Sequence, residues 1–137
     1  MQVLYTAHAT ATGGRDGRAV SDDRQLDVAL AMPPALGGNG AGSNPEQLFA
    51  AGYAACFLSA LKLVAGQQRV ALPATAAVAV AVSIGRDDSG FGLAVSLNIS
   101  LPGVATEAAQ TVIDAAHQVC PYSHATRGNI AVSLQLA

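Results

Sequence analysis

The chain has 137 residues, enough for one domain with a hydrophobic core, and we expect a single domain over residues 1–137. Hydrophobic residues make up 51% of it, charged residues only 12%, and the formal net charge is −2. This charge argues against nucleic acid or an anionic membrane as the main partner. So few charges would cover a monomer poorly, which favours a homo-oligomer that buries apolar surface between its subunits.

The cellular setting is inferred from the N-terminus and the cysteines. The first residues contain neither a basic region nor a long apolar run, so we expect no signal peptide. No segment of membrane-spanning length lacks polar interruptions, so we expect no membrane insertion. A cytoplasmic protein is therefore predicted. In that compartment two cysteines, Cys56 and Cys120, are more often catalytic or redox-active than a structural disulfide.

The first third of the chain predicts three strands and a long loop. Residues 3–12 alternate loosely and predict an N-terminal strand. A glycine-rich turn over 13–18 leads into a second strand at 19–21, which completes a hairpin. Residues 25–32 predict a third strand. The following loop, 33–43, contains two prolines and four glycines, and loops of this length are usually functional or mobile.

A buried helix is predicted over residues 45–65, and the rest of the chain is organised around it. Asn44 suits the N-cap position, and Glu46 favours the positive end of the helix dipole. Gly66 is a natural residue to end the helix. Apolar and small residues recur along one face at helical spacing: Leu48, Phe49, Gly52, Tyr53, Cys56, Phe57, Ala60, Leu61 and Val64. Cys56 is therefore either an inert core thiol or a buried reactive one.

The second half of the chain predicts strands before and after a second helix. The expected elements are strands over 78–84, 93–101 and 130–136, a turn over 86–90, a helix over 106–119 and a short helical turn over 121–127. The second helix ends near Cys120 because Pro121 disfavours helical geometry in the residue before it. The order βββ-α-ββ-α-β predicts an α+β fold with mostly antiparallel sheet, and not a doubly wound fold.

Phosphate and metal sites have weaker support. The glycine-rich segment 38–42 precedes a helix, but its spacing is not the dinucleotide fingerprint and no parallel βαβ unit surrounds it. A metal site would have to be built from His117, Cys120 and His124. Zinc requires three or four converging ligands, and no paired-cysteine spacing supplies them, so no metal is expected.

The two cysteines are the remaining candidates for chemistry. Cys56 lies beyond the first-turn reach of its helix dipole, and burial raises the pKa of a thiol, so reactivity would require a nearby cation. Arg15 and Arg18 lie in a glycine-rich turn that is able to bend over a site. An unperturbed cysteine is only about 3% thiolate at pH 7, so full ionisation would raise the reactive fraction about thirtyfold. The residues alone leave a reactive pair and two buried structural cysteines as alternatives.

Three segments carry a family resemblance: NPEQLFAAGYAACF at 44–57, VCPYSHATRGNI at 119–130 and ATGGRDGRA at 11–19. They resemble the two cysteine signatures and the N-terminal hairpin of the organic hydroperoxide resistance (Ohr) proteins, within the Ohr/OsmC family. The resemblance spans essentially the whole chain. The long block around Cys56 and the Val-Cys-Pro-Tyr-Ser run favour the Ohr branch over the OsmC branch.

The resemblance implies an OsmC/Ohr-like fold that forms an intertwined homodimer with active sites at the subunit interface. It also implies a thiol peroxidase for organic, including alkyl and fatty-acid, hydroperoxides. Cys56 matches the peroxidatic cysteine and Cys120 the resolving one. Arg15 matches the arginine that supports the thiolate, and Glu46 the carboxylate that holds this arginine. No bound cofactor is implied, and the reductant is dihydrolipoamide or a lipoylated protein.

The implied mechanism proceeds through a Cys56 sulfenic acid, which condenses with Cys120 to a disulfide that a dithiol opens by exchange. Phe49, Tyr53, Phe57 and Leu36 are candidates for an apolar substrate pocket, although packing in the core is the favoured role for each.

Two departures from the family pattern are visible. His124 stands where asparagine is expected, and Ala131 stands where aspartate is expected. Both lie beyond Cys120, so they bear on the local surface or on reductant docking and not on the peroxidatic step. The alternative functions are an OsmC-branch peroxidase with a broad substrate range and a non-catalytic OsmC-like stress or binding protein.

Overall fold

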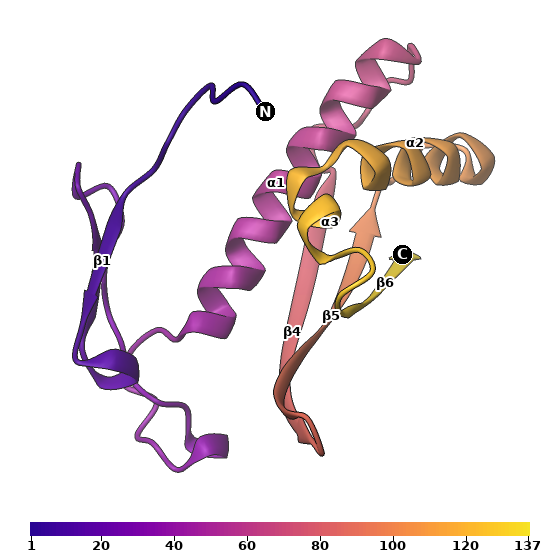
Figure 1. The fold of residues 1–137 in the computed structure, drawn as a ribbon. Helices are drawn as coiled ribbons and strands as arrows, with labels where there is room; N and C mark the ends of the chain where they lie inside the picture. Colours follow the sequence, from indigo (N-terminus) through magenta and orange to yellow (C-terminus); the bar gives the residue numbers. More distant parts are fainter. The chain divides into compact units, whose positions relative to one another are not determined.

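The computed structural model describes residues 1–137, which divide into two compact units, Met1–Leu48 and Phe49–Ala137. Each unit contains one three-stranded sheet, and a long helix begins in the first unit and continues into the second (Figure 1). The α+β class and the mostly antiparallel pairing are as predicted. The single-domain arrangement stays a prediction.

The first unit holds an antiparallel sheet in the order β1-β2-β3. Its elements are β1 (Ala9–Thr12), the 3-10 turn Gly14–Asp16, β2 (Arg18–Ser21), β3 (Asp27–Ala29) and the 3-10 turn Pro34–Leu36. The predicted glycine-rich turn and hairpin are confirmed. Gly13 has the left-handed φ of 73° that the tight turn requires, which glycine adopts at little cost.

Two strands of this unit are shorter than predicted, because a strand extends only as far as its partner. The pairing of β1 with β2 ends at Ala9 opposite Ser21, so residues 3–8 do not continue the expected strand. The third strand ends at Ala29, because Leu30 leaves the sheet to form a parallel bridge with Ser43.

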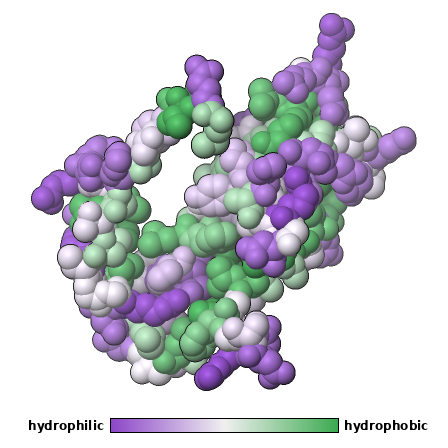
Figure 2. Space-filling model, in the orientation of Figure 1, coloured by the Kyte–Doolittle hydropathy of each residue, from purple (hydrophilic) through white to green (hydrophobic).

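The first unit buries little apolar surface. Leu30 and Ala31 are its buried hydrophobic residues, whereas Val3, Leu4 and Tyr5 are largely exposed. Figure 2 likewise shows hydrophobic residues open at the surface. A segment of this size without a core of its own needs further apolar surface to pack against.

Helix α1 (Pro45–Gln67) begins as predicted and ends later than predicted. The Asn44 side chain accepts a hydrogen bond of 2.9 Å from the Gln47 backbone N–H, which confirms it as the N-cap. The helix runs past Gly66, and Arg69 takes the left-handed position with φ of 57°. The Arg69 N–H donates to Gly66 and the Val70 N–H donates to Ala65, which together form a Schellman motif without glycine at its usual position.

By length and composition, α1 is apolar enough to cross a membrane, contrary to the expectation that no segment is. One third of its most apolar window is buried within the chain. Central helices of globular proteins have the same composition, so this property does not assign α1 to a membrane. It does leave apolar helix surface that a second protein surface would cover.

The second unit contains the remaining strands and helices. They are β4 (Ala77–Asp87), β5 (Gly90–Ser100), α2 (Thr106–Val119), α3 (Pro121–Thr126) and β6 (Ala131–Leu136). The predicted second helix and the short helical turn are confirmed. Strands β4 and β5 pair antiparallel and extend into the turn predicted over 86–90, so that residues 88–89 connect them, and β6 pairs parallel to β5. The pattern of β6 alone did not specify that direction.

One hydrophobic core holds the second unit together. It combines Tyr53, Phe57, Leu61 and Val64 of α1 with Val95, Leu97 and Ile99 of β5, and with Val112, Ile113 and Ala116 of α2. Cys120 is fully buried in this core, and Cys56 packs against its edge. The packing of α1 and α2 in one core therefore brings together two cysteines that lie 64 residues apart in the sequence.

Candidate active site

The Sγ atoms of Cys56 and Cys120 lie 3.6 Å apart, and both cysteines are free thiols. Cys56 is half-buried on α1, whereas Cys120 is completely buried between α2 and α3. The extended backbone of Cys120 (φ −63°, ψ 121°) interrupts the helix before Pro121, as predicted. A disulfide bond is about 2.05 Å long, so a small movement of the two side chains would suffice to form one.

The environment of Cys56 within this unit favours the protonated thiol. Burial raises the pKa of Cys56, and the hydrogen-bonding and charge interactions between the two neighbouring cysteines raise it further. The backbone N–H of Tyr122 opposes this shift by donating a hydrogen bond to the sulfur, without reversing it. The second unit therefore brings the two sulfurs together in surroundings that oppose ionisation of Cys56.

Tyr122 is a site residue that sequence reasoning missed. Its ring lies near the rings of Phe49 and Tyr53, at centroid distances of 5.9 and 5.6 Å. Gly52 makes room for it, because a Cβ at that position would lie 2.9 Å from the Tyr122 hydroxyl. The signal available beforehand was the position of Tyr122 inside the second cysteine motif, but only the fold shows its contacts with α1.

A hollow of about 360 Å³ adjoins this aromatic cluster, with Phe49, Leu93, Tyr122 and Ile130 among its lining residues. Of the predicted substrate-pocket residues, Phe49 lines it. Tyr53 and Phe57 do not, because both side chains are fully buried in the core. Leu36 belongs to the first unit, where it ends a 3-10 turn and is partly exposed.

Arg15 and Glu46 form the bidentate ion pair that the family resemblance implied. Arg15 Nη1 lies 2.8 Å from Glu46 Oε2, and Nη2 lies 2.7 Å from Oε1. The hydrogen bond from Arg15 is the main reason that the pKa of Glu46 is lowered, and the same bond raises the pKa of Arg15. The guanidinium is therefore held in one orientation and stays charged.

The other candidate arginine is already engaged. Arg18 pairs with Asp27 at 2.6 Å on the exposed side of the hairpin. Arg15 and Cys56 belong to different units of the chain, and the proximity of these two residues stays a prediction.

The residues considered for a metal site do not converge. No three His, Cys, Asp or Glu side chains are grouped as metal ligands would be. The backbone carbonyl of His117 accepts a hydrogen bond from Arg127. The Nδ1 atom of the His117 ring is buried without a hydrogen-bond partner. Burial and the Arg127 charge lower the pKa of His117. His124 and Ala131, the two departures from the family pattern, are both exposed.

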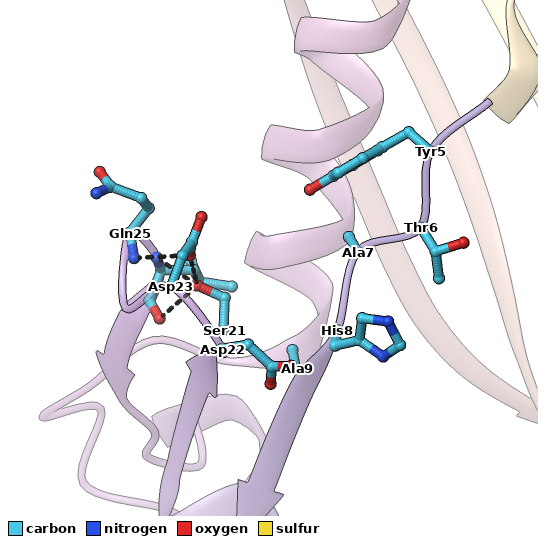
Figure 3. A pocket seen from close by; sticks show the side chains of 10 residues that line it. Tyr5, Thr6, Ala7, His8, Ala9, Ser21, Asp22, Asp23 and Gln25 are labelled. Atoms are coloured by element: carbon cyan, nitrogen blue, oxygen red, sulfur yellow. Dashed lines mark hydrogen bonds between the residues drawn. The ribbon is translucent and has the colours of Figure 1, made fainter.

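A second hollow, of about 520 Å³, lies in the first unit and is lined by residues of the N-terminal segment and of the β2–β3 turn (Figure 3). The Ser21 hydroxyl and the Gln25 N–H both donate to the Asp23 carboxylate, at 2.6 and 3.0 Å. These polar groups thus satisfy one another within the turn. The hollow contains neither of the cysteines nor Arg15.

Comparison with known proteins gives consistent matches along the chain. Residues 37–135 match the family model described as OsmC-like protein. The organic hydroperoxide resistance protein of Xanthomonas axonopodis pv. citri is 59% identical over 137 residues, covering 99% of this chain and 96% of that protein.

Two solved structures show how closely the fold is shared. An organic hydroperoxide resistance protein from Elizabethkingia anophelis is 50% identical with a TM-score of 0.94, covering 100% of this chain and 99% of that one. The OhrB protein of Bacillus subtilis is 46% identical with a TM-score of 0.89, covering 98% of this chain and 100% of that one.

Proposed function

Because the chain belongs to the organic hydroperoxide resistance (Ohr) proteins of the OsmC-like family, we propose that it is a cysteine-based thiol peroxidase that reduces organic hydroperoxides to alcohols. The observation that carries the proposal is the pair of free thiols, Cys56 and Cys120, whose sulfur atoms lie 3.6 Å apart. Two thiols at this distance are suited to a cycle in which one is oxidised and the other closes the disulfide.

In the proposed reaction, the Cys56 thiolate attacks the distal oxygen of the hydroperoxide. The O–O bond breaks, and the alkoxide leaves and takes up the proton that the thiol gave up, so that an alcohol and a Cys56 sulfenic acid remain. The Cys120 thiol then displaces the sulfenic hydroxyl as water and forms the disulfide. A dithiol reductant restores both thiols by exchange.

Arg15 is proposed to supply the positive charge that this cycle requires. A thiol whose pKa is raised by burial is a poor nucleophile until an opposite charge favours its ionised form. The bidentate contact with Glu46 fixes the Arg15 guanidinium in one orientation. In the proposed site, Arg15 stabilises the Cys56 thiolate and donates hydrogen bonds to the peroxide oxygens.

The proposed assembly is an intertwined homodimer in the cytoplasm. The exposed apolar side of α1 and the small core of the first unit both support a second copy as the covering surface. Dihydrolipoamide or a lipoylated protein is the proposed reductant, and no bound cofactor is required.

Steady-state consumption of tert-butyl hydroperoxide with dihydrolipoamide tests the function. The wild type is expected to turn over and Cys56→Ser to be inactive, whereas Cys120→Ser reacts once and accumulates a sulfenic acid that dimedone traps. A wild type that consumes no hydroperoxide would favour the non-catalytic alternative. A Cys56→Ser variant that keeps the wild-type rate would rule out the assigned nucleophile.

A further inference from the structure

Three hydroxyl groups meet inside the core next to the cysteine pair. The Tyr53 hydroxyl lies 2.9 Å from Ser123 Oγ and 3.3 Å from Thr126 Oγ1. All three residues, named here the hydroxyl cluster, are buried, with exposures of 0%, 0% and 5%. Burying polar groups in an apolar core is costly unless they bond to one another, so this arrangement requires that every hydroxyl be satisfied.

The cluster meets that requirement with each hydroxyl donating once. Thr126 Oγ1 lies 3.0 Å from the backbone carbonyl of Tyr122, to which it donates. Its oxygen is then free to accept from Tyr53, and the Tyr53 oxygen accepts from Ser123. All three protons are therefore used, and the chain of bonds ends on a backbone carbonyl of α3.

Two members of the hydroxyl cluster each lie three residues from one of the two cysteines. Tyr53 precedes Cys56 by three residues, one turn earlier on neighbouring positions of α1. Ser123 follows Cys120 by three residues, in the first turn of α3. The Tyr53–Ser123 bond therefore joins the two helices one turn away from each thiol.

We propose that the hydroxyl cluster of Tyr53, Ser123 and Thr126 is a positioning element that sets the rate at which Cys120 closes onto oxidised Cys56. This inference rests on the proposed peroxidase function. In the step concerned, the S–S bond forms, the S–O bond of the sulfenic acid breaks, and the hydroxyl leaves as water with the Cys120 proton. The cluster takes no part in that chemistry and acts by holding α3 against α1.

The rate at which Cys120 forms the disulfide with oxidised Cys56 depends strongly on how the two sulfur atoms are positioned. An intramolecular attack gains its rate from the geometry in which the reacting atoms are held, and small misplacements lower that rate steeply. A sulfenic acid that waits longer for Cys120 is exposed to a second hydroperoxide, which oxidises it irreversibly to sulfinic acid. The cluster thus protects Cys56 from overoxidation.

Rapid-quench mass spectrometry of the full-length protein separates the two steps. Reduced protein receives one equivalent of tert-butyl hydroperoxide, and the sulfenic acid (as its dimedone adduct) and the disulfide are followed with time. In Ser123→Ala we expect the sulfenic acid to form within about twofold of the wild-type rate and the disulfide to form about tenfold more slowly. Under excess hydroperoxide this variant accumulates more sulfinic acid than the wild type.

Matched variants distinguish the hydroxyl from its packing. Thr126→Val keeps the shape of the side chain without the hydroxyl and is expected to slow closure, whereas Thr126→Ser keeps the hydroxyl and retains the wild-type rate. Ser59→Ala removes an exposed hydroxyl that bonds only to the Ala55 carbonyl of the same helix, and should leave both steps unchanged.

The outcomes are distinguishable. Disulfide closure at the wild-type rate in folded Ser123→Ala and Thr126→Val would overturn the positioning role and leave the peroxidase intact. Equal slowing of both steps would also overturn it, because a general disturbance of the core would then explain the result. Wild-type thiols that survive the hydroperoxide would overturn the proposed function, and this inference with it.

Discussion

At the scale of single residues, the Cys56 thiol needs a cation that its own unit does not supply. Burial raises its pKa, and none of the groups that shift it within Phe49–Ala137 is a cationic side chain. A peroxidatic cysteine must nevertheless react as the thiolate. In the proposed mechanism this charge comes from Arg15, which Glu46 orients through two hydrogen bonds.

Removing that charge should move the titration of Cys56. We expect Arg15→Ala, in a Cys120→Ser background, to raise the pKa of Cys56, because the proposed site then lacks the opposite charge that favours the ionised thiol. The ultraviolet absorbance of the thiolate, followed as a function of pH, measures the pKa of Cys56. Arg18→Ala is the matched control, since Arg18 pairs with Asp27. Identical titrations in the two variants would remove Arg15 from the mechanism.

The Arg15–Glu46 pair also predicts how stability depends on pH. The pKa of Glu46 is lowered in the folded chain, chiefly by the hydrogen bond from Arg15. The contribution of Glu46 to the free energy of unfolding is therefore complete above the ordinary carboxyl pKa of about 4.3. It is lost as the pH falls through the lowered pKa that Glu46 has in the folded chain. Glu46→Gln should be less stable than the wild type at neutral pH, and this difference should narrow on acidification. Urea unfolding midpoints across the pH range provide the measurement, and a constant difference would contradict the prediction.

At the scale of elements, two glycines of α1 make opposite predictions. A Cβ at Gly66 would meet nothing within 4 Å, so Gly66→Ala should stabilise the protein by about 0.5–1 kcal/mol through helix propensity alone. At Gly52 the same gain is opposed, because the Cβ would lie 2.9 Å from the Tyr122 hydroxyl.

Thermal unfolding of the two variants tests this contrast. We expect Gly66→Ala to raise the Tm by a few degrees. Gly52→Ala should not raise it, because the Tyr122 ring would have to shift to admit the added methyl group. Equal stabilisation of both variants would show that the Tyr122 ring moves away at no cost.

The elements that the sequence predicted well are those with local signals. Asn44 marks the start of α1, and Pro121 marks the break at Cys120, because capping and proline geometry act between near neighbours. The element boundaries that were predicted wrongly depend on contacts between distant parts of the sequence or on an unusual local backbone conformation. The first strand stops where its partner stops, and α1 continues past Gly66 because Arg69 takes the left-handed position.

The residues of the candidate site likewise divide into those that the sequence predicted and those that only the structure shows. Cys56, Cys120, Arg15 and Glu46 follow from motif resemblance, and the structure adds the distances of the sulfur pair and of the ion pair. The role of the Tyr122 backbone could not be predicted, because its contact with Cys56 exists only after α1 and α3 pack together. The hydroxyl cluster depends on the same packing.

At the scale of the whole molecule, the apolar surface predicts a homodimer. The first unit has almost no core, and much of α1 remains exposed. Sedimentation equilibrium should therefore give twice the chain mass of 13.7 kDa. A stable, folded species of a single chain mass would contradict the assembly, and a different surface would then have to cover α1.

Cys56 and Cys120 are proposed to reduce organic hydroperoxides, and a count of free thiols after a single turnover tests this assignment. Reduced protein receives one equivalent of tert-butyl hydroperoxide or of hydrogen peroxide, followed by rapid acid quench. We expect both thiols to be lost quickly with the organic hydroperoxide and slowly with hydrogen peroxide. Equal rates would indicate a broad-range peroxidase of the OsmC branch. Thiols that persist in the organic hydroperoxide would contradict the enzyme assignment and leave two buried structural cysteines.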